Sequence, residues 1–301
     1  NLSTSQISQL TSVQIGGLSS TQIGSFTAEQ AASLTPAEAA YFKTLVNLPV
    51  GDITSLDPKF ISAIPSKVFG TLSTAQLDAL NAEQVGALTS VQISALTGTK
   101  LLALGNTSPS DIAAIAPAAL AGLTKDALSS LNLSTLNGDG QFAGLTSAQI
   151  GLLSTVQMGS LSADQAAALT GPQIAAITSA QVKALTTAAI SSIAPKNIAS
   201  LDAKAIAAMN YSDSTTAGQI SAITVEQVPF LTSAQAKAIT SLQIGQFSAE
   251  EIQALTPAAL AAITSTAFAS IDSTAFAGLT PAQVAALTPV QITKLNSGGA
   301  S

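Results

Sequence analysis

The stretch LTPAQVAALTPVQITKL, residues 279–295, contains the same short pattern twice, eight positions apart. In each copy a leucine is followed by threonine, proline and, two residues later, glutamine. Eight residues is not a multiple of the 3.6-residue helical period, so the pattern does not suit one continuous helix. The residues inside it do not alternate as those of an amphipathic strand do. The stretch therefore predicts a structural unit that starts again every eight residues.

This eight-residue unit, the octad, extends through most of the 301-residue chain. Thirty complete octads can be read from their leading apolar residue, in runs that begin at Leu2, Leu56, Ile115, Leu145 and Ile223. Positions 1 and 6 are apolar in all thirty octads, position 2 is Ser, Thr, Asn or Asp in twenty-seven, and position 5 is Gln or Glu in nineteen. Position 8 is Ala, Gly or Ser in twenty-three. Seven of the twelve prolines stand at position 3.

The octad has the pattern of a helix N-terminus. Position 2 suits an N-cap, whose side-chain oxygen accepts from a free backbone N–H, and position 5 is then the Gln or Glu of a capping box. Position 3 is the first helical residue, where proline is tolerated, and positions 1 and 6 form a hydrophobic staple. A new N-cap every eight residues limits each helix to about five or six residues. Helices this short are unstable alone and need neighbours.

The sequence therefore predicts an all-α solenoid of very short capped helices, one per octad, with positions 1 and 6 pointing into one continuous interior. Either two or three octads per superhelical turn is compatible with the pattern. A β-solenoid is the alternative fold, because Ile and Val at position 6 and the many threonines favour strands. Alanine, glutamine and the capping pattern favour the helical fold. One continuous solenoid over residues 1–301 is the expected domain organisation.

Longer units interrupt the octads at 42–55, 104–114, 131–144 and 209–222. They are interpreted as longer loops or extra turns. Because each contains Asn and Asp residues, lateral contact sites or cation sites are the alternative, although the NGDG run at 137–140 lacks the ligand spacing of an EF-hand. Four asparagines begin N-x-[ST] sequons and are possible glycosylation sites: Asn1, Asn106, Asn132 and Asn210.

Composition argues against several classes of function. The chain has ten Lys, no Arg and a net charge of −6, a balance that does not favour a nucleic-acid partner. It contains no His and no Cys, so the common nucleophile–base pairs and zinc sites are not available. Ser–Lys and carboxylate-pair mechanisms remain formally open. We expect a non-enzymatic protein with no catalytic residues, no metal and no cofactor. The most apolar stretch, 113–123, is shorter than the roughly 20 residues of a membrane span.

The ends of the sequence are in phase with each other. If Ser301 were followed by another Asn1, Leu2 of the second copy would come eight residues after Leu295. The octad pattern would then continue across a head-to-tail joint. This phase fits either a covalent array of 301-residue blocks or subunits stacked end to end, and a disordered SGGAS tail is the alternative interpretation. Self-association, either head-to-tail or lateral, is the expected partnership.

The octads in LTSAQIGLLSTVQMGSLSADQAAAL, residues 145–169, resemble octapeptide repeats of the form L-[TS]-x-x-Q-[IV]-x-A in very large secreted bacterial surface proteins, some of them adhesin-like or haem-utilisation-like. The resemblance implies export, an extracellular or cell-surface location, and a stalk, fibre or matrix role. It carries over no catalytic or binding residue, and haem ligation is not supported because only Met158 and Met209 are available. The expected function is thus a structural rod, stalk or head-to-tail filament. A ligand-binding or adhesive scaffold within a large adhesin is the alternative.

Overall fold

The computed structural model describes residues 2–23, 25–35, 38, 48–104, 110–211 and 218–297. Within these ranges the chain is all-α, with many short helices and no strand, so the helical fold class is confirmed and the β-solenoid alternative is wrong. Contacts divide the chain into two units, Asn1–Leu145 and Thr146–Ser301, and each is described by itself.

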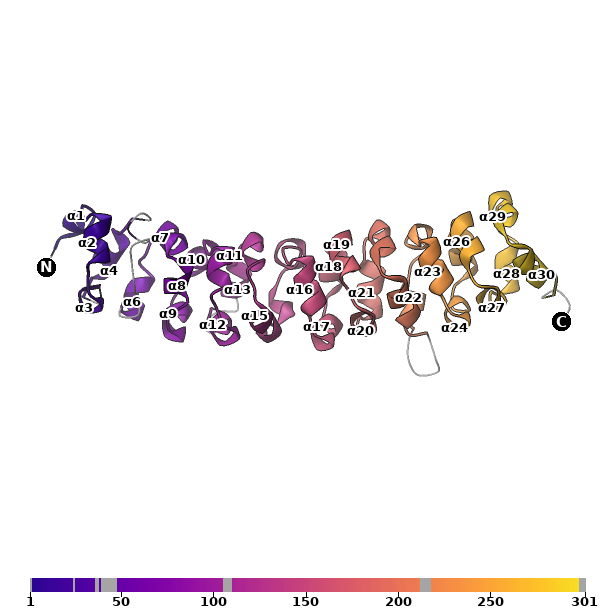
Figure 1. The fold of residues 1–301 in the computed structure, drawn as a ribbon, viewed down its shortest axis with the longest axis horizontal. Helices are drawn as coiled ribbons and strands as arrows, with labels where there is room; N and C mark the ends of the chain where they lie inside the picture. The colour runs from indigo at the N-terminus through magenta and orange to yellow at the C-terminus, as the bar shows by residue number, and fades with distance from the viewer. Residues whose placement is uncertain are drawn as a thin grey trace. The chain divides into compact units, whose positions relative to one another are not determined.

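The first unit is a succession of short α-helices that ends in a 3₁₀-helix and a π-helical turn (Figure 1). Its elements are α1 (Thr4–Ile7), α2 (Ser12–Gly16), α3 (Ser20–Ile23), α4 (Ala28–Ala32), α6 (Val50–Ile53), α7 (Pro58–Ala63), α8 (Ser66–Phe69), α9 (Thr74–Asp78), α10 (Ala82–Gly86), α11 (Ser90–Ile93), α12 (Gly98–Ala103), α13 (Ser110–Ala114), α14 (Pro117–Leu120), α15 (Lys125–Ser130), η1 (Leu133–Thr135) and η2 (Gly138–Phe142).

The second unit repeats the same arrangement with short 3₁₀ segments among its α-helices. Its elements are α16 (Ser147–Leu152), α17 (Thr155–Gly159), α18 (Ala163–Ala167), α19 (Gly171–Ala175), α20 (Ser179–Val182), α21 (Thr187–Ser192), η3 (Pro195–Ser200), α22 (Ala203–Ala208), η4 (Ile220–Ala222), η5 (Val228–Phe230), α23 (Ser233–Ala238), α24 (Ser241–Ile244), α25 (Ala249–Ala254), α26 (Pro257–Ala262), α27 (Ser265–Phe268), α28 (Ser273–Phe276), α29 (Pro281–Ala286) and α30 (Pro289–Ser297).

The predicted capping boxes are present at the helix starts. At α16 the backbone N–H of Thr146 donates to Gln149 Oε1 (2.7 Å), and the N–H of Gln149 donates back to Thr146 Oγ1 (3.2 Å). The same reciprocal pair opens α1, α2, α4, α9, α10, α11, α17, α18, α20, α23, α24, α25 and α29. Local side-chain chemistry therefore fixes where most of these helices begin.

Three octads make one superhelical turn. Most helices pack on the helix three places before them or three places after them, and α10 packs on both α7 and α13. In the second unit α26 lies between α23 and α29 in the same way. The choice between two and three octads per turn, which the sequence leaves open, is therefore three, and each unit is a stack of such turns (Figure 1).

In most turns the interior contains residues from three of the eight octad positions. Positions 1 and 6 are buried as predicted, for example Leu96 and Ile93. Position 5 is buried too: Gln92 is 1 % exposed, and where this position is not glutamine it holds residues such as Phe60 or Ala119, which are also buried. The octad pattern indicates only a capping role for position 5, so the structure adds a third inward-facing position.

The longer units keep the helical pattern on either side of them. Within 42–55, residues 48–55 follow the octad pattern around α6, and residues 42–47 lie outside the described residues. Residues 131–144 form η1 and η2, with the Asn137 side chain accepting from the N–H groups of Gly140 and Gln141.

Parts of the other two longer units also lie outside the described residues, namely 105–109 and 212–217. Across 209–222 the cap bond persists, because the N–H of Asn210 donates to Gln219 Oε1 (3.1 Å) nine residues later. One continuous solenoid over the whole chain stays a prediction.

Candidate functional site

The position-5 glutamines bind two successive turns together. Gln84 Oε1 accepts from the N–H of Asn81 (3.0 Å), which completes the cap of α10. Its Nε2 donates to the carbonyls of Ile53 and Leu56, both at 2.7 Å. These carbonyls lie 31 and 28 residues earlier, one at the last residue of α6 and one at the start of the next octad. One amide therefore satisfies a helix start in its own turn and carbonyl groups in the turn before it.

The same bonds recur at regular positions, and we call them the glutamine ladder. Its members, each donating from Nε2 to a carbonyl of the preceding turn, include Gln30, Gln76, Gln84, Gln92, Gln141, Gln181, Gln219, Gln227, Gln235, Gln243, Gln283 and Gln291. All of them are at most 9 % exposed. A buried amide needs its hydrogen bonds, so these glutamines fix the register between turns.

The ladder is unaffected by the insertion at 209–222. Gln181 donates to Ile150 and Leu153, at separations of 31 and 28 residues. Gln243 donates to Ile206 and Met209, at separations of 37 and 34 residues. The six extra residues lengthen the connection without changing which octad positions are bonded.

Side chains other than glutamine can also donate from the ladder position. Lys100 lies in α12 at position 5 of its octad, and its Nζ donates to the carbonyl of Gly70. Asn197 in η3 donates from Nδ2 to the carbonyl of Leu169 (2.9 Å), 28 residues earlier. Leu169 stands at position 1, where glutamines also find an acceptor, and Gly70 stands at position 7, one residue after the usual position-6 acceptor.

Glu251 replaces glutamine at this position and cannot donate when it is ionised. Its Oε2 accepts from the N–H of Ser248 (2.7 Å), so the capping half of the role is kept. Burial raises the pKa of the Glu251 carboxyl above its ordinary value, against the lowering effect of the Ser248 hydrogen bonds, and the charge of Glu250 raises it further. The ladder position therefore disfavours a negative charge.

The first turn presents three ladder glutamines whose Nε2 groups have no acceptor among the described residues. Gln6, Gln14 and Gln22 keep their caps, as in the 2.8 Å bond from the N–H of Ser3 to Gln6 Oε1, but all three side chains are exposed. The next ladder residue, Gln30, is buried and donates to the carbonyl of Leu2. Because a ladder glutamine donates to the turn before its own, only the three glutamines of the first turn lack an acceptor within the described ranges, and Gln30 is the first to find one.

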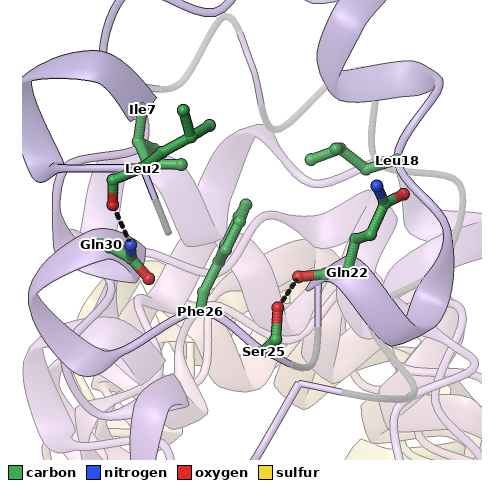
Figure 2. A pocket seen from close by; sticks show the side chains of 7 residues that line it. All are labelled: Leu2, Ile7, Leu18, Gln22, Ser25, Phe26 and Gln30. Carbon is green, nitrogen blue, oxygen red and sulfur yellow. Dashed lines mark hydrogen bonds between the residues drawn. The ribbon is translucent and has the colours of Figure 1, made fainter.

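Beside these amides lies a pocket (Figure 2). Its lining includes the apolar residues Leu2, Ile7, Leu18 and Phe26 and the amides Gln22 and Gln30. In Figure 2 the Gln30 amide meets the Leu2 carbonyl, whereas the Gln22 amide ends near Leu18 with no bond drawn to it. The first turn thus combines apolar surface with unused donors.

The C-terminal part of the second unit has carbonyls that the ladder does not use. From the end of α27 onward, three successive pairs of carbonyls receive no side-chain donor from the described residues: Phe268 with Ile271, Phe276 with Leu279, and Val284 with Leu287. These occupy the same octad positions as the carbonyls used by the ladder elsewhere. Val284 and Ile292, at position 6, are 46 % and 42 % exposed, whereas described position-6 residues before α28 are at most 2 % exposed.

Two of the four asparagines predicted as glycosylation sites lie among the described residues. Asn132 is exposed, and its Oδ1 accepts from the N–H of Ser134 (3.1 Å); Asn210 is exposed beside the cap bond to Gln219. Asn1 and Asn106 lie outside the described residues, and glycosylation stays a prediction at all four. Where residues are described, no three His, Cys, Asp or Glu side chains gather as metal ligands.

The ALTTAQ repeat family matches residues 61–98. This range runs from within α7 into α12, so the match supports a repeat region over this part of the first unit. No curated protein matches the chain. In the described residues, no helix combines the length and apolarity needed to cross a bilayer.

Proposed function

We propose that the protein is a structural, non-enzymatic, extracellular protein that forms an elongated rod, stalk or head-to-tail filament at a bacterial surface. The observation that carries the proposal is the glutamine ladder. In the described interior, the buried amides of the ladder form hydrogen bonds from one turn to the next. Such bonds resist separation of the turns, which suits a protein that bears load along its length. Charged residues make up only 9 % of the chain, which supports association because neighbouring copies repel each other weakly.

The extracellular location rests on the resemblance of the octads to those of secreted bacterial surface proteins. Immunogold labelling of intact bacteria that produce the protein, with antibody raised against the 301-residue chain, tests this part. Label on the cell surface or on material between cells is expected. Label found only after the envelope is permeabilised contradicts the extracellular assignment.

Assembly is tested separately on the purified protein. Negative-stain microscopy and small-angle X-ray scattering over a hundredfold range of concentration are expected to show elongated particles that lengthen at constant cross-section. Compact particles whose dimensions do not change with concentration contradict the proposal. Short particles that stay single but coat a host glycan or protein support the adhesive scaffold instead.

A further inference from the structure

We infer that copies of the protein pair side by side, with an acidic face on the second unit of one copy against a basic face on the second unit of another. The charged residues are Glu226, Glu250 and Asp272 on the acidic face and Lys183, Lys204 and Lys237 on the basic face. This inference goes beyond the proposed head-to-tail filament, because it concerns contact between neighbouring rods and does not depend on how their ends meet.

The acidic face lies on one column of stacked elements in the second unit. In this column η3 packs on η5, η5 on α25, and α25 on α28. Glu226 lies two residues before η5, Glu250 lies in α25, and Asp272 is the N-cap of α28. All three side chains are exposed, and the three octads that contain them have no lysine. Three successive turns therefore each present a carboxylate on this column.

The basic face lies on the next column of the same unit. Here α20 packs on α22, and α22 packs on α23. Lys183 directly follows α20, Lys204 lies in α22, and Lys237 lies in α23; all three are exposed. Asp202, the N-cap of α22, is the one acid in these three octads, and its Oδ1 accepts from the backbone N–H of Lys204 (2.8 Å). The basic face therefore keeps a net positive charge.

The spacing of the charges identifies a second copy of this chain as the partner. Stacked elements are one superhelical turn apart, so the lysines and the carboxylates repeat at the same distance along their columns. When two copies lie side by side, Lys204 can meet Glu250 with a further ion pair on each side of it. A partner with another repeat would match at a single row. A second copy has the matching repeat over all three rows.

The carboxylates of the acidic face are held in their charged form. The backbone N–H and the hydroxyl of Thr274 donate to Asp272 Oδ1 (2.8 and 2.6 Å). Hydrogen bonds from the side chains of Thr224 and Thr274 hold the pKa of the Glu226 and Asp272 carboxyls below their ordinary values. Single exposed ion pairs contribute little, so the contact depends on the three rows acting together and on the orientation that they select.

The contact is heterologous, because it uses a different face on each of the two copies. A pair of rods joined in this way still has one free acidic face and one free basic face. Further copies can therefore add on both sides, and rods would gather into sheets or bundles.

Zero-length cross-linking with a water-soluble carbodiimide tests the contact on the natural chain. An equimolar mixture of unlabelled and isotope-labelled protein is treated at low salt, and mass spectrometry identifies peptide pairs that contain both isotopes. Lys204 linked to Glu250 is the expected pair between copies. A flanking link from Lys183 to Glu226 indicates parallel rods, and one from Lys183 to Asp272 indicates antiparallel rods. Links spread evenly over the exposed lysines and carboxylates of the chain overturn the inference.

A triple variant removes the basic face. With Lys183→Gln, Lys204→Gln and Lys237→Gln, we expect side-by-side association at low salt to weaken by at least about tenfold, measured by sedimentation velocity. The matched control has the same net charge and consists of Ala188→Glu, Leu242→Glu and Thr266→Glu, at exposed positions of the third column, in α21, α24 and α27. Equal weakening by the two triple variants, or none by the first, overturns the inference.

Exchanging the charges provides a rescue experiment. Lys183→Glu, Lys204→Glu and Lys237→Glu give a chain with two acidic faces, and Glu226→Lys with Glu250→Lys gives a chain with two basic faces. Neither variant should pair with itself, whereas an equimolar mixture should pair as wild type does. Both variants keep a negative net charge, so attraction between whole molecules does not explain such a rescue. A mixture that stays unpaired overturns the inference.

Salt separates this inference from the proposed function. Because charges more than about 10 Å apart are screened at 0.1 M salt, wild-type particles should thicken at about 0.02 M salt and return to single-rod thickness at about 0.5 M. Particles that lengthen but never thicken would leave the proposed filament standing and overturn the side-by-side contact. Particles that thicken at low salt but never lengthen would support the contact and contradict the filament.

Discussion

At the scale of single residues, the difference between glutamine and glutamate explains the choice at position 5. Either side chain can accept the hydrogen bond of an N-cap, but only glutamine can also donate at neutral pH. Seventeen of the thirty complete octads have Gln at this position and two have Glu. The donor is the part of the side chain that reaches the preceding turn, so the preference follows from packing between turns rather than from capping.

Gln84→Glu tests this directly. The variant keeps the bond to Asn81 and loses the two donated bonds to Ile53 and Leu56, leaving a buried charge opposite two carbonyls. We expect a loss of about 3 kcal/mol or more in the free energy of unfolding, measured by urea titration with circular dichroism. The same substitution at exposed Gln14 in dilute protein is the control, with an expected change within about 0.5 kcal/mol. Equal losses at the two positions would contradict the donor role.

Glu251→Gln is the converse experiment and gives a pH dependence. Because the pKa of Glu251 is raised in the folded state, folded protein binds more protons than unfolded protein between the ordinary carboxyl pKa and the raised one. Stability is therefore lost as pH rises through that window. Glu251→Gln should stabilise the protein by about 1 kcal/mol at pH 7, from the regained donated bonds, and by less near pH 4.

Urea midpoints of wild type and variant at the two pH values measure the effect. Glu250→Gln, at the exposed neighbouring position, removes the same charge and serves as the control, with little expected change at pH 7. A midpoint for Glu251→Gln that is raised equally at both pH values would mean that protonation of Glu251 plays no part.

The cap was predictable from sequence and the ladder was not. Thr146 and Gln149 are three residues apart, so the pattern alone indicates their contact. The contact of Gln84 with Ile53 depends on how many octads make a turn, which no local pattern specifies. A signal was nevertheless present, since a cap needs only an acceptor and glutamate would serve. The excess of Gln over Glu pointed to a donor with a distant partner.

At the scale of elements, the helices are too short to be stable alone, and the close approach of successive turns keeps them folded. Gly122, at position 8 of its octad, shows how close that approach is. A Cβ added there would lie 1.9 Å from the carbonyl oxygen of Ser90, in the turn before. The sequence shows small residues at position 8 in most octads, but their partner at position 3 emerges only from the three-octad turn.

Gly122→Ala is therefore expected to destabilise the first unit by about 2 kcal/mol or more, because backbone has to move to accommodate the methyl group. Gly51→Ala is the matched control. Gly51 lies inside α6, and nothing comes within 4 Å of an added Cβ, so the change should stabilise by about 0.5–1 kcal/mol through helix propensity. Both effects can be read from urea midpoints. An unchanged urea midpoint for Gly122→Ala would show that the turns have room to separate.

At the scale of the whole molecule, each unit is held together by contacts between neighbouring turns, as in α10 with α7 and α13. Stability in such an arrangement is a sum of local terms, and a defect in one turn is felt mainly by the turns beside it. The octad periodicity predicted this organisation. It did not predict the division into two units, because the octads on both sides of Leu145 and Thr146 have the same pattern.

Hydrogen exchange measured by mass spectrometry tests the local character of the defect. In Gly122→Ala, peptides from residues 88–130 should exchange several-fold faster than in wild type, because that turn opens more often. Peptides from residues 231–270 should exchange at the wild-type rate. Faster exchange in both regions would show that the molecule unfolds as one cooperative body.

The hydrogen bonds of the glutamine ladder on either side of residues 209–222 have a practical consequence. Gln243 finds the same class of carbonyl as Gln181 although six more residues separate it from that carbonyl. Additional residues can therefore be inserted between an N-cap and its glutamine without changing the hydrogen bonds that join the turns. Evolution, or an engineer, can use such a position to display peptides at chosen heights, each one added without disturbing its neighbours.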